Sequence, residues 1–91
     1  MSVTLRIPPA LRSLTGGEEE LSMEGGTVRA VLDAAENAHP GLKSRVCNDE
    51  GNVLRFVNLF VNEDDIRMLD GLDTALKAGD SVSIIPAIAG G

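Results

Sequence analysis

The sequence contains one cysteine, one histidine and no tryptophan or tyrosine. A single cysteine cannot form an internal disulfide or a cysteine-only metal site, so side-chain packing must stabilise the fold. A reactive thiol needs an electropositive, partly open setting, and nothing in the sequence around Cys47 indicates one. His39 precedes Pro40 at the end of a helical pattern, where a structural role is usual. We therefore expect no catalytic residue in this chain.

Positive charge and long apolar runs are also scarce. Eight basic residues stand against fourteen acidic ones, which gives a net charge of −6 and disfavours nucleic acids and anionic membranes as partners. A basic protein surface is the better match. No stretch reaches the roughly 18 apolar residues of a membrane-spanning helix, and the first residues lack the pattern of a secretory signal. We expect a cytoplasmic protein.

Ligand-binding motifs are missing as well. The sequence contains neither G-x-x-x-x-G-K-[ST] nor G-x-G-x-x-G, the glycine-rich loops that hold phosphate groups. The acidic clusters 18–20 and 63–65 lack the spacing of a calcium-binding loop. We interpret both clusters as solvated surface, with 63–65 as a secondary candidate for contact with a basic partner. The sequence thus predicts no bound metal and no resident cofactor.

What is present is the pattern of one small α+β domain. The 91 residues are 43% apolar and 24% charged, which is typical of a folded globular chain. Apolar and polar residues alternate over 2–7 and again over 18–24, and this period of two predicts two strands. The Gly16-Gly17 pair between them favours a turn, so the two strands are expected to form a hairpin.

A helix and three further elements are expected after this hairpin. Thr27 can cap a helix, and the apolar stripe that follows predicts a helix ending near Ala38; the stripe consists of Val28, Val31, Leu32 and Ala35. Residues rich in β-branched and aromatic side chains over 52–62 predict a third strand. A short helical turn is expected within 71–76 and the last strand over 81–86.

This order of elements predicts the β-grasp, or ubiquitin-like, fold: a mixed sheet packed on one main helix. A right-handed crossover through the helix places the last strand beside the first, and a single helix covers only one face of the sheet. Pro86 lacks the N–H that would continue the sheet. We therefore expect a domain over 1–86 and a flexible tail over 87–91.

The uncovered face of the sheet is a candidate for protein contact. In the alternating pattern, Phe56 and Phe60 fall opposite the apolar core side of the third strand, and Ile85 does the same in the last strand. Large apolar groups on an uncovered face are typical of a protein interface. The alternative is that loops bury them. If the face binds a partner, Arg55 and Arg67 are expected at its rim.

The residues after the last strand form a narrow peptide that ends in two glycines. Glycine has no Cβ, so its backbone can closely approach the active site of another protein, and the carboxylate of Gly91 is unhindered. A carboxylate becomes a good electrophile only when one oxygen is converted into a leaving group, and joining it to AMP achieves this. The ATP for that step must come through a partner, because the chain itself has no nucleotide motif.

These features together resemble the MoaD/ThiS family of ubiquitin-like sulfur carriers over essentially the whole chain. The resemblance rests on "RFVNLFVNEDDIR", on the "GLDTAL" turn and on "GDSVSIIPAIAGG". Within the family, the wording is most similar to carriers that feed sulfur to a cysteine synthase of the CysM type. The resemblance also places Phe60 and Ile85 at sheet positions that dock partners.

The resemblance implies a definite chemistry for the tail. An enzyme of the MoeB/ThiF type would adenylate Gly91, and a sulfur donor would then convert it to a thiocarboxylate. In the cysteine branch, a pyridoxal phosphate enzyme of the CysM type would accept the sulfur, and a zinc peptidase would release the product. The segment expected to enter these partners consists of Pro86, Ala87, Ile88, Ala89, Gly90 and Gly91.

Other uses of the same fold and tail remain open. A carrier of the MoaD type would supply molybdopterin synthesis instead of cysteine synthesis. A ubiquitin-like modifier would let a lysine of a target protein attack the activated Gly91. A third reading is an adaptor whose sheet face binds one partner and whose tail is inert.

Overall fold

The computed structural model describes residues 2–86, which form a five-stranded sheet, one α-helix and four short 3-10 helices. The strands are β1 (Ser2–Arg6), β2 (Glu20–Glu24), β3 (Val57–Val61), β4 (Asp64–Asp65) and β5 (Ser81–Pro86), and the α-helix is α1 (Val28–Ala38). The 3-10 helices are η1 (Pro9–Thr15), η2 (Lys43–Arg45), η3 (Ile66–Met68) and η4 (Gly71–Asp73).

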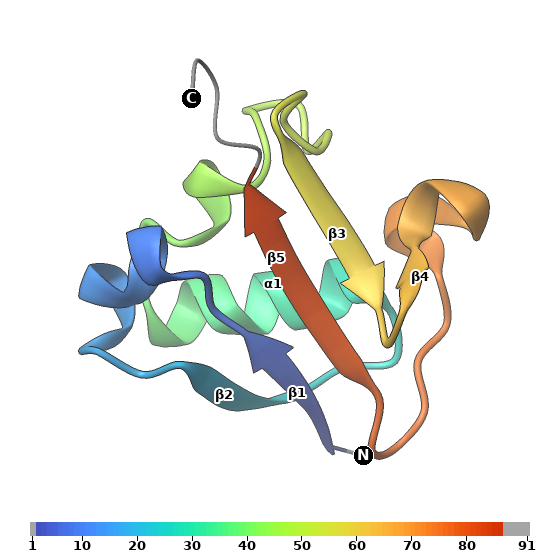
Figure 1. The fold of residues 1–91 in the computed structure, drawn as a ribbon, viewed down its shortest axis with the longest axis horizontal. Helices are drawn as coiled ribbons and strands as arrows, with labels where there is room; N and C mark the ends of the chain where they lie inside the picture. Colours follow the sequence, from blue (N-terminus) through green and yellow to red (C-terminus); the bar gives the residue numbers. More distant parts are fainter. Residues whose placement is uncertain (1, 87–91) are drawn as a thin grey trace.

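The sheet is mixed, with the strand order β2-β1-β5-β3-β4 (Figure 1). β5 lies beside β1 and runs parallel to it, while the other neighbouring pairs are antiparallel. The predicted placement of the last strand beside the first is therefore confirmed. β5 is the middle strand of the five, so both of its edges are paired and its position is fixed by two neighbours.

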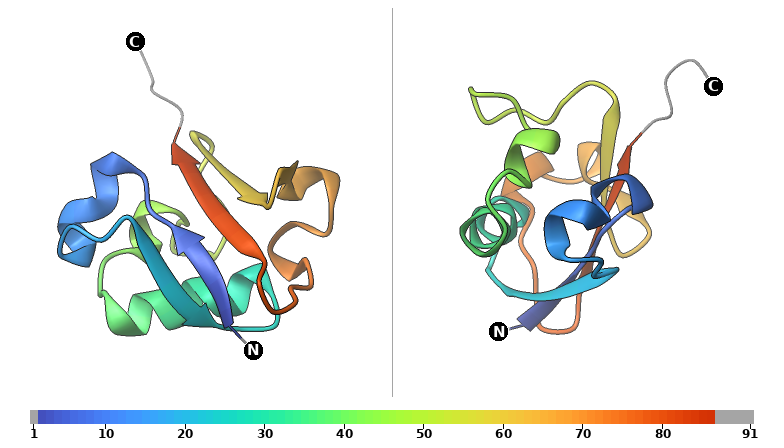
Figure 2. Two further views of the ribbon diagram at one scale, coloured as in Figure 1. Left: turned by 60° about the horizontal axis from the view of Figure 1, so that its bottom comes forward. Right: turned by 90° about the vertical axis from the view of Figure 1, so that its left-hand side faces the viewer.

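α1 packs across one face of the sheet and leaves the other face open (Figures 1 and 2). The helix begins where predicted, because the Thr27 hydroxyl accepts a hydrogen bond from the Ala30 N–H over 3.1 Å and so satisfies one of the free donors of the first turn. Its predicted apolar stripe is buried against the sheet, where it meets Val3, Leu5, Leu59, Val82 and Ile84. The β-grasp prediction is confirmed.

The first two strands pair as predicted, but their connection differs. Leu5 and Leu21 are register partners in the antiparallel β1/β2 pair. Between the strands lies η1, a 3-10 helix that begins directly after Pro8 and buries Leu11. A proline suits the first position of a helix, where its missing N–H is not needed. The two prolines therefore open a helical turn that closes one end of the core.

The third strand is shorter than predicted. β3 begins at Val57, and the residues before it form an isolated bridge between Cys47 and Val53 followed by a turn at 55–56. Leu54 donates its N–H to the Val46 carbonyl over 2.8 Å, and Val57 donates to the Leu54 carbonyl over 3.0 Å. These bonds pull the chain out of the sheet, so the strand predicted over 52–62 is wrong in its first half.

The segments around η2, η3 and η4 complete the core. Leu42 and Val46 flank η2 and are fully buried. Ile66, the first residue of η3, and Leu76, which follows η4, are also buried. By contrast, Met68 on η3 is 82% exposed. Within residues 2–86, α1 has eleven residues, and no helix is long and apolar enough to span a bilayer.

Candidate functional site

The site predicted from the sequence begins where β5 ends. Pro86 is the last residue of β5 and is the register partner of Val57, the first residue of β3. The final pair of the β3/β5 ladder thus stands at the edge of the described structure. Residues 87–91 lie outside the described residues, so the roles predicted for Gly90 and Gly91 stay predictions. The structure defines the end of β5, which directly precedes that segment in the sequence.

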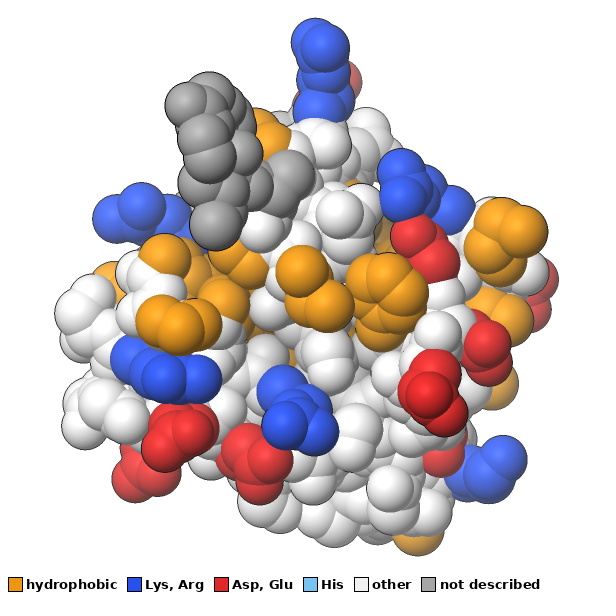
Figure 3. Space-filling view, in the orientation of Figure 1, with side chains coloured by type: hydrophobic (Ala, Val, Ile, Leu, Met, Phe, Trp, Pro, Cys, Tyr) orange, Lys and Arg blue, Asp and Glu red, His pale blue; other side chains and the backbone are white. Residues whose placement is uncertain are grey.

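The outer face of the sheet carries two of the three predicted docking residues. Ile85 is directly opposite Asn58, and Phe60 is directly opposite Ser83. Since directly opposed residues share a face, all four lie on the side away from α1. Ile85 is 47% exposed and Phe60 is partly buried. Figure 3 looks onto this face and shows hydrophobic side chains near its centre, with polar and charged groups around them.

The third predicted docking residue, Phe56, lies elsewhere. It belongs to the turn before β3 and is 52% exposed. It lines a cavity together with Leu11, Ile84 and Pro86, of which Ile84 is part of the core on the α1 side of the sheet. The alternating pattern had placed Phe56 with Phe60. The turn breaks that alternation, so the structure brings Phe60 and Ile85 together and separates Phe56 from them.

An ion pair borders the outer face beside β3. The Arg67 guanidinium donates to both Asp65 oxygens, with 3.1 Å between Nε and Oδ1 and 2.7 Å between Nη2 and Oδ2. Nη2 also donates to Asn58 Oδ1 over 3.0 Å. The hydrogen bonds from Arg67 hold the pKa of the Asp65 carboxyl below its usual value. Arg67 is therefore anchored next to the outer face, in the place expected of a rim residue.

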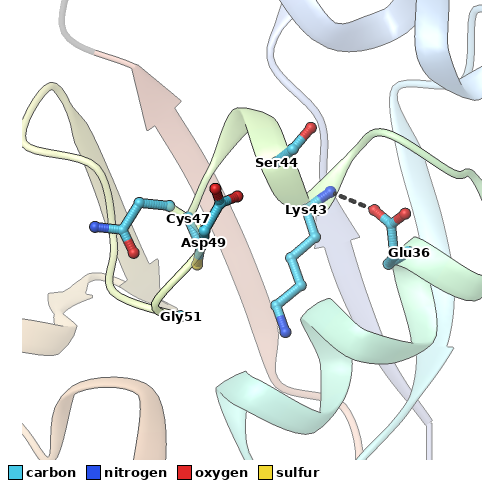
Figure 4. Close-up of a pocket in the computed structure, with 7 residues that line it drawn as sticks. Glu36, Lys43, Ser44, Cys47, Asp49 and Gly51 are labelled. Atoms are coloured by element: carbon cyan, nitrogen blue, oxygen red, sulfur yellow. Dashed lines mark hydrogen bonds between the residues drawn. The ribbon is translucent and has the colours of Figure 1, made fainter.

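A second cavity holds the only cysteine, at the C-terminal end of α1 (Figure 4). The Glu36 carboxylate accepts hydrogen bonds from the N–H groups of Gly41 and Lys43, at 3.0 and 2.9 Å, and these bonds lower its pKa. Cys47 is only 3% exposed, and burial raises the pKa of its thiol. The Lys43 ammonium pairs with Asp33. These interactions join α1 to the loop that contains Gly41 and Lys43, which is a structural role.

The side chains that could bind a metal or act as nucleophiles are spread over the described residues. Among residues 2–86, no group of three or more metal-ligating side chains is gathered in one place. The cysteine and the histidine are not brought into one cavity, since Cys47 lines the cavity of Figure 4 and His39 does not. The predicted site residues that the structure describes lie on the outer face and at the end of β5.

Comparisons with known proteins agree with this picture. The ThiS family model matches residues 5–91. The chain is 44% identical to the sulfur carrier protein CysO of Mycobacterium tuberculosis, over the whole of both chains. It is also 41% identical over 68 residues to small archaeal modifier protein 3 of Haloferax volcanii, an alignment that covers 75% of this chain and 73% of that protein.

The fold comparison points the same way. In a crystal structure of the BexX/CysO complex from Amycolatopsis orientalis, one chain superposes on this protein with a TM-score of 0.92 and 43% identity, covering 98% of this chain and 99% of that one. The resemblance noted in β3, η4 and β5 is thus confirmed over the full length of the fold. This chain belongs to the ThiS family of ubiquitin-like β-grasp proteins.

Proposed function

We propose that this protein is a sulfur carrier of cysteine biosynthesis and that Gly91 carries the sulfur as a thiocarboxylate. The observation that carries this proposal is the 44% identity to a CysO sulfur carrier across the whole of both chains, with the family match extending to Gly91. The fold supports it, because the middle strand of the sheet leads directly into the segment that would be charged.

The first step is activation of the Gly91 carboxylate by a separate enzyme of the MoeB/ThiF type. A carboxylate oxygen attacks the α-phosphorus of ATP, and pyrophosphate leaves with the electron pair of the broken P–O bond. The product is an acyl adenylate. The enzyme supplies the nucleotide site, since the carrier has no phosphate-binding loop. The carrier itself holds no cofactor and acts as a co-substrate.

The second step replaces oxygen by sulfur. A sulfide sulfur attacks the acyl carbon, a C–S bond forms, and the C–O bond to AMP breaks with its electrons leaving on AMP. The thiocarboxylate that results is a strong nucleophile at neutral pH. In the cysteine branch, the thiocarboxylate sulfur adds to the β-carbon of a dehydrated amino acid substrate held by a pyridoxal enzyme of the CysM type, which forms a thioester. The amine of that product then attacks the Gly91 carbonyl carbon and the C–S bond breaks, so that cysteine with a free thiol is joined to Gly91 by an amide bond. A zinc peptidase then hydrolyses that amide and frees the carrier.

In this cycle the carrier's own role is to bind each enzyme so that Gly91 reaches the enzyme's active site. A partner that binds the outer face contacts Ile85 and Phe60, which lie on β5 and β3 within the rigid part of the sheet. Burying such groups supplies affinity at a fixed distance from Pro86. The tail then enters the enzyme without having to provide the affinity itself. Phe56, at the end of the sheet, adds a contact close to Pro86.

A second candidate function is conjugation to proteins. The similarity to small archaeal modifier protein 3 favours it, since 41% of 68 aligned residues are identical. In that case a lysine amine, rather than sulfide, attacks the activated Gly91 and forms an isopeptide bond. A carrier for molybdopterin synthesis, the MoaD type, is a further branch with the same activation chemistry and a different sulfur acceptor.

A reconstituted transfer reaction tests the proposed function. The chain is incubated with a MoeB/ThiF-type enzyme, ATP and isotopically labelled sulfide, then purified and mixed with a CysM-type synthase and its amino acid substrate. We expect the label in cysteine after peptidase treatment. A variant lacking Gly91 is expected to keep its fold and to transfer no label, while Met68→Ala, an exposed change on η3, is expected to transfer as the wild type does.

The outcomes separate the candidates. Label that reaches a large molybdopterin synthase subunit and not the CysM-type enzyme would contradict the cysteine branch and favour the MoaD type. Larger species on a denaturing gel, with Gly91-to-lysine links found by mass spectrometry, would favour the modifier. Transfer that persists in the variant lacking Gly91 would overturn the proposed role of the tail.

A further inference from the structure

A second surface feature lies where β5 ends, on the side of the sheet opposite to the Ile85 and Phe60 face. It is a cavity of about 290 Å³ between η1, η2 and the turn before β3. We call it the tail-base cavity. Its walls are mainly apolar, and the residues that matter here are Leu11, Arg45, Leu54, Phe56, Ile84 and Pro86. An apolar cavity of about 150 Å³ already holds a benzene-sized group, so this one has room for a large side chain.

Phe56 makes the tail-base cavity unusual as a surface. Phe56 is 52% exposed although it forms one wall of the cavity. Together with Leu54 it also lines a neighbouring open hollow, so the two side chains form a ridge between the two depressions. A half-exposed aromatic ring beside an apolar cavity is typical of interface anchor points, where aromatic residues are enriched.

The charge at the tail-base cavity is opposite to that of the whole chain. The protein has a net charge of −6, yet no acidic side chain lines the tail-base cavity or the neighbouring hollow. Arg45 lines the first and Arg55 the second. Within residues 2–86, neither arginine is joined to a carboxylate by an ion pair. A partner with an apolar side chain next to a carboxylate would complement this surface.

The tail-base cavity lies next to the start of the tail, and this position indicates which partner covers it. Pro86 is itself part of the cavity wall, and Gly91 follows five residues later in the sequence. A fully extended chain spans at most about 3.6 Å per residue, so Gly91 lies within about 18 Å of Pro86 however the segment runs. An enzyme that holds Gly91 in its active site must therefore bring its own surface close to the tail-base cavity.

We propose that the tail-base cavity receives an apolar side chain, flanked by a carboxylate, from the enzyme that adenylates Gly91. This inference rests on the proposed function and adds a second contact to it. The apolar side chain packs inside the cavity against Phe56 and Leu11, and the carboxylate pairs with Arg45. The enzyme then contacts the carrier on both sides of β5, at the outer face and at the tail-base cavity. These two contacts fix the orientation of β5 and so the direction in which the tail enters the enzyme.

Kinetics of adenylation test the inference. The initial rate of pyrophosphate release is measured against carrier concentration for the wild type, Phe56→Ala and Arg45→Glu. We expect each variant to raise KM by about tenfold, the size of a typical interface anchor, with kcat unchanged because the tail and Gly91 are intact. Arg45→Lys should recover most of the affinity. High salt should reduce the effect of Arg45→Glu.

Matched controls use exposed residues away from the cavity. Met68→Ala removes an apolar side chain that is more exposed than Phe56, and Lys77→Glu makes the same change of charge as Arg45→Glu at an exposed position. Both should keep the KM of the wild type within about twofold. Thermal unfolding of every variant shows whether the fold is intact. If Phe56→Ala unfolds, the exposed Arg45→Glu still decides the question.

Each result has a distinct meaning. If the wild type is adenylated and both cavity variants match it, the inference is overturned and the proposed function stands. If the wild type is not adenylated at all, the proposed function fails and the inference falls with it. A KM that decreases in Phe56→Ala would mean that the cavity holds the chain's own tail, and a dimer that is lost in Phe56→Ala would mean that it holds a second copy. Both findings would also overturn the inference.

Discussion

Val57 and Pro86 face each other in the last pair of the β3/β5 ladder. This pair marks the point where the described structure passes into the segment that the function requires. Because proline has no N–H, Pro86 itself donates no hydrogen bond to this ladder. The strand that ends there is the middle strand of the sheet, held by β1 on one edge and β3 on the other. Pro86, the residue before the tail, therefore belongs to a strand that is paired on both sides.

The outer face is expected to affect binding without affecting stability. Ile85→Thr keeps a β-branched side chain in β5 but removes much of the apolar surface. Since Ile85 is 47% exposed, we expect the free energy of unfolding to change by less than about 0.5 kcal/mol. The KM for adenylation, measured by pyrophosphate release, should rise about fivefold, because an apolar interface contact is lost. An unchanged KM would mean that the activating enzyme does not contact this face.

Asn62 is expected to contribute to stability through its side chain and its backbone. It has a positive φ of 57°, its amide donates to Asp80 Oδ1 over 3.2 Å, and its Oδ1 accepts from the Ser81 N–H over 3.1 Å. Asn62→Gly keeps the backbone conformation and loses both bonds, so we expect a loss of about 1 kcal/mol. Asn62→Ala adds backbone strain and should lose about 1 kcal/mol more. Urea unfolding measures both; equal stability of the two variants would contradict the backbone part.

Glu36 is expected to make stability depend on pH. Its carboxylate binds the N–H groups of Gly41 and Lys43, and these bonds lower its pKa in the folded state. A lowered pKa means that the folded state favours the charged form. The stabilisation is therefore fully present above the unfolded pKa, which is about 4.3 for glutamate, and is lost as the pH falls through the folded value.

Glu36→Gln should accordingly be less stable than the wild type at pH 7. The difference should shrink as the pH falls below about 4, where the wild-type carboxylate becomes protonated. Thermal unfolding across this pH range measures it. Glu63→Gln, an exposed change in the β3/β4 turn, serves as the matched control and should follow the wild type. A difference for Glu36→Gln that stays constant with pH would contradict the assigned cause.

Cys47 is expected to be a structural thiol. It is 3% exposed and burial raises its pKa, so little thiolate forms at neutral pH and access is restricted. Alkylation of the folded chain should be much slower than that of free cysteine and should accelerate when denaturant unfolds the chain. Cys47→Ala should still be adenylated with the kcat of the wild type. Rapid alkylation of the folded chain would contradict this assignment.

The sequence predicted those elements that local signals define. α1 follows from one cap and one apolar stripe, because a helix is built from contacts three and four residues apart. The pairing of β5 with β1 follows from the general handedness of such crossovers. Ile85 and Phe60 were placed on the open face by strand alternation alone, and the register of β3 and β5 agrees.

Elements that depend on tertiary contacts were missed. η1 follows Pro8 and closes the end of the core through Leu11, a role visible only once the sheet and helix are assembled. Phe56 was misplaced because "VLRFV" reads as a strand, whereas the bonds of Leu54 and Val57 turn the chain before the sheet begins. Alternation is informative only while the strand continues. The tail-base cavity arises from that same turn, so no pattern in the sequence indicated it.

The central claim is that sulfur is attached to Gly91. The most direct test is the mass of the intact chain and of its C-terminal fragments after incubation with a MoeB/ThiF-type enzyme, ATP and sulfide. The account predicts exchange of one oxygen for sulfur, located at Gly91 and dependent on both ATP and enzyme. An unchanged mass with several such enzymes, or sulfur found on Cys47 in place of Gly91, would contradict it.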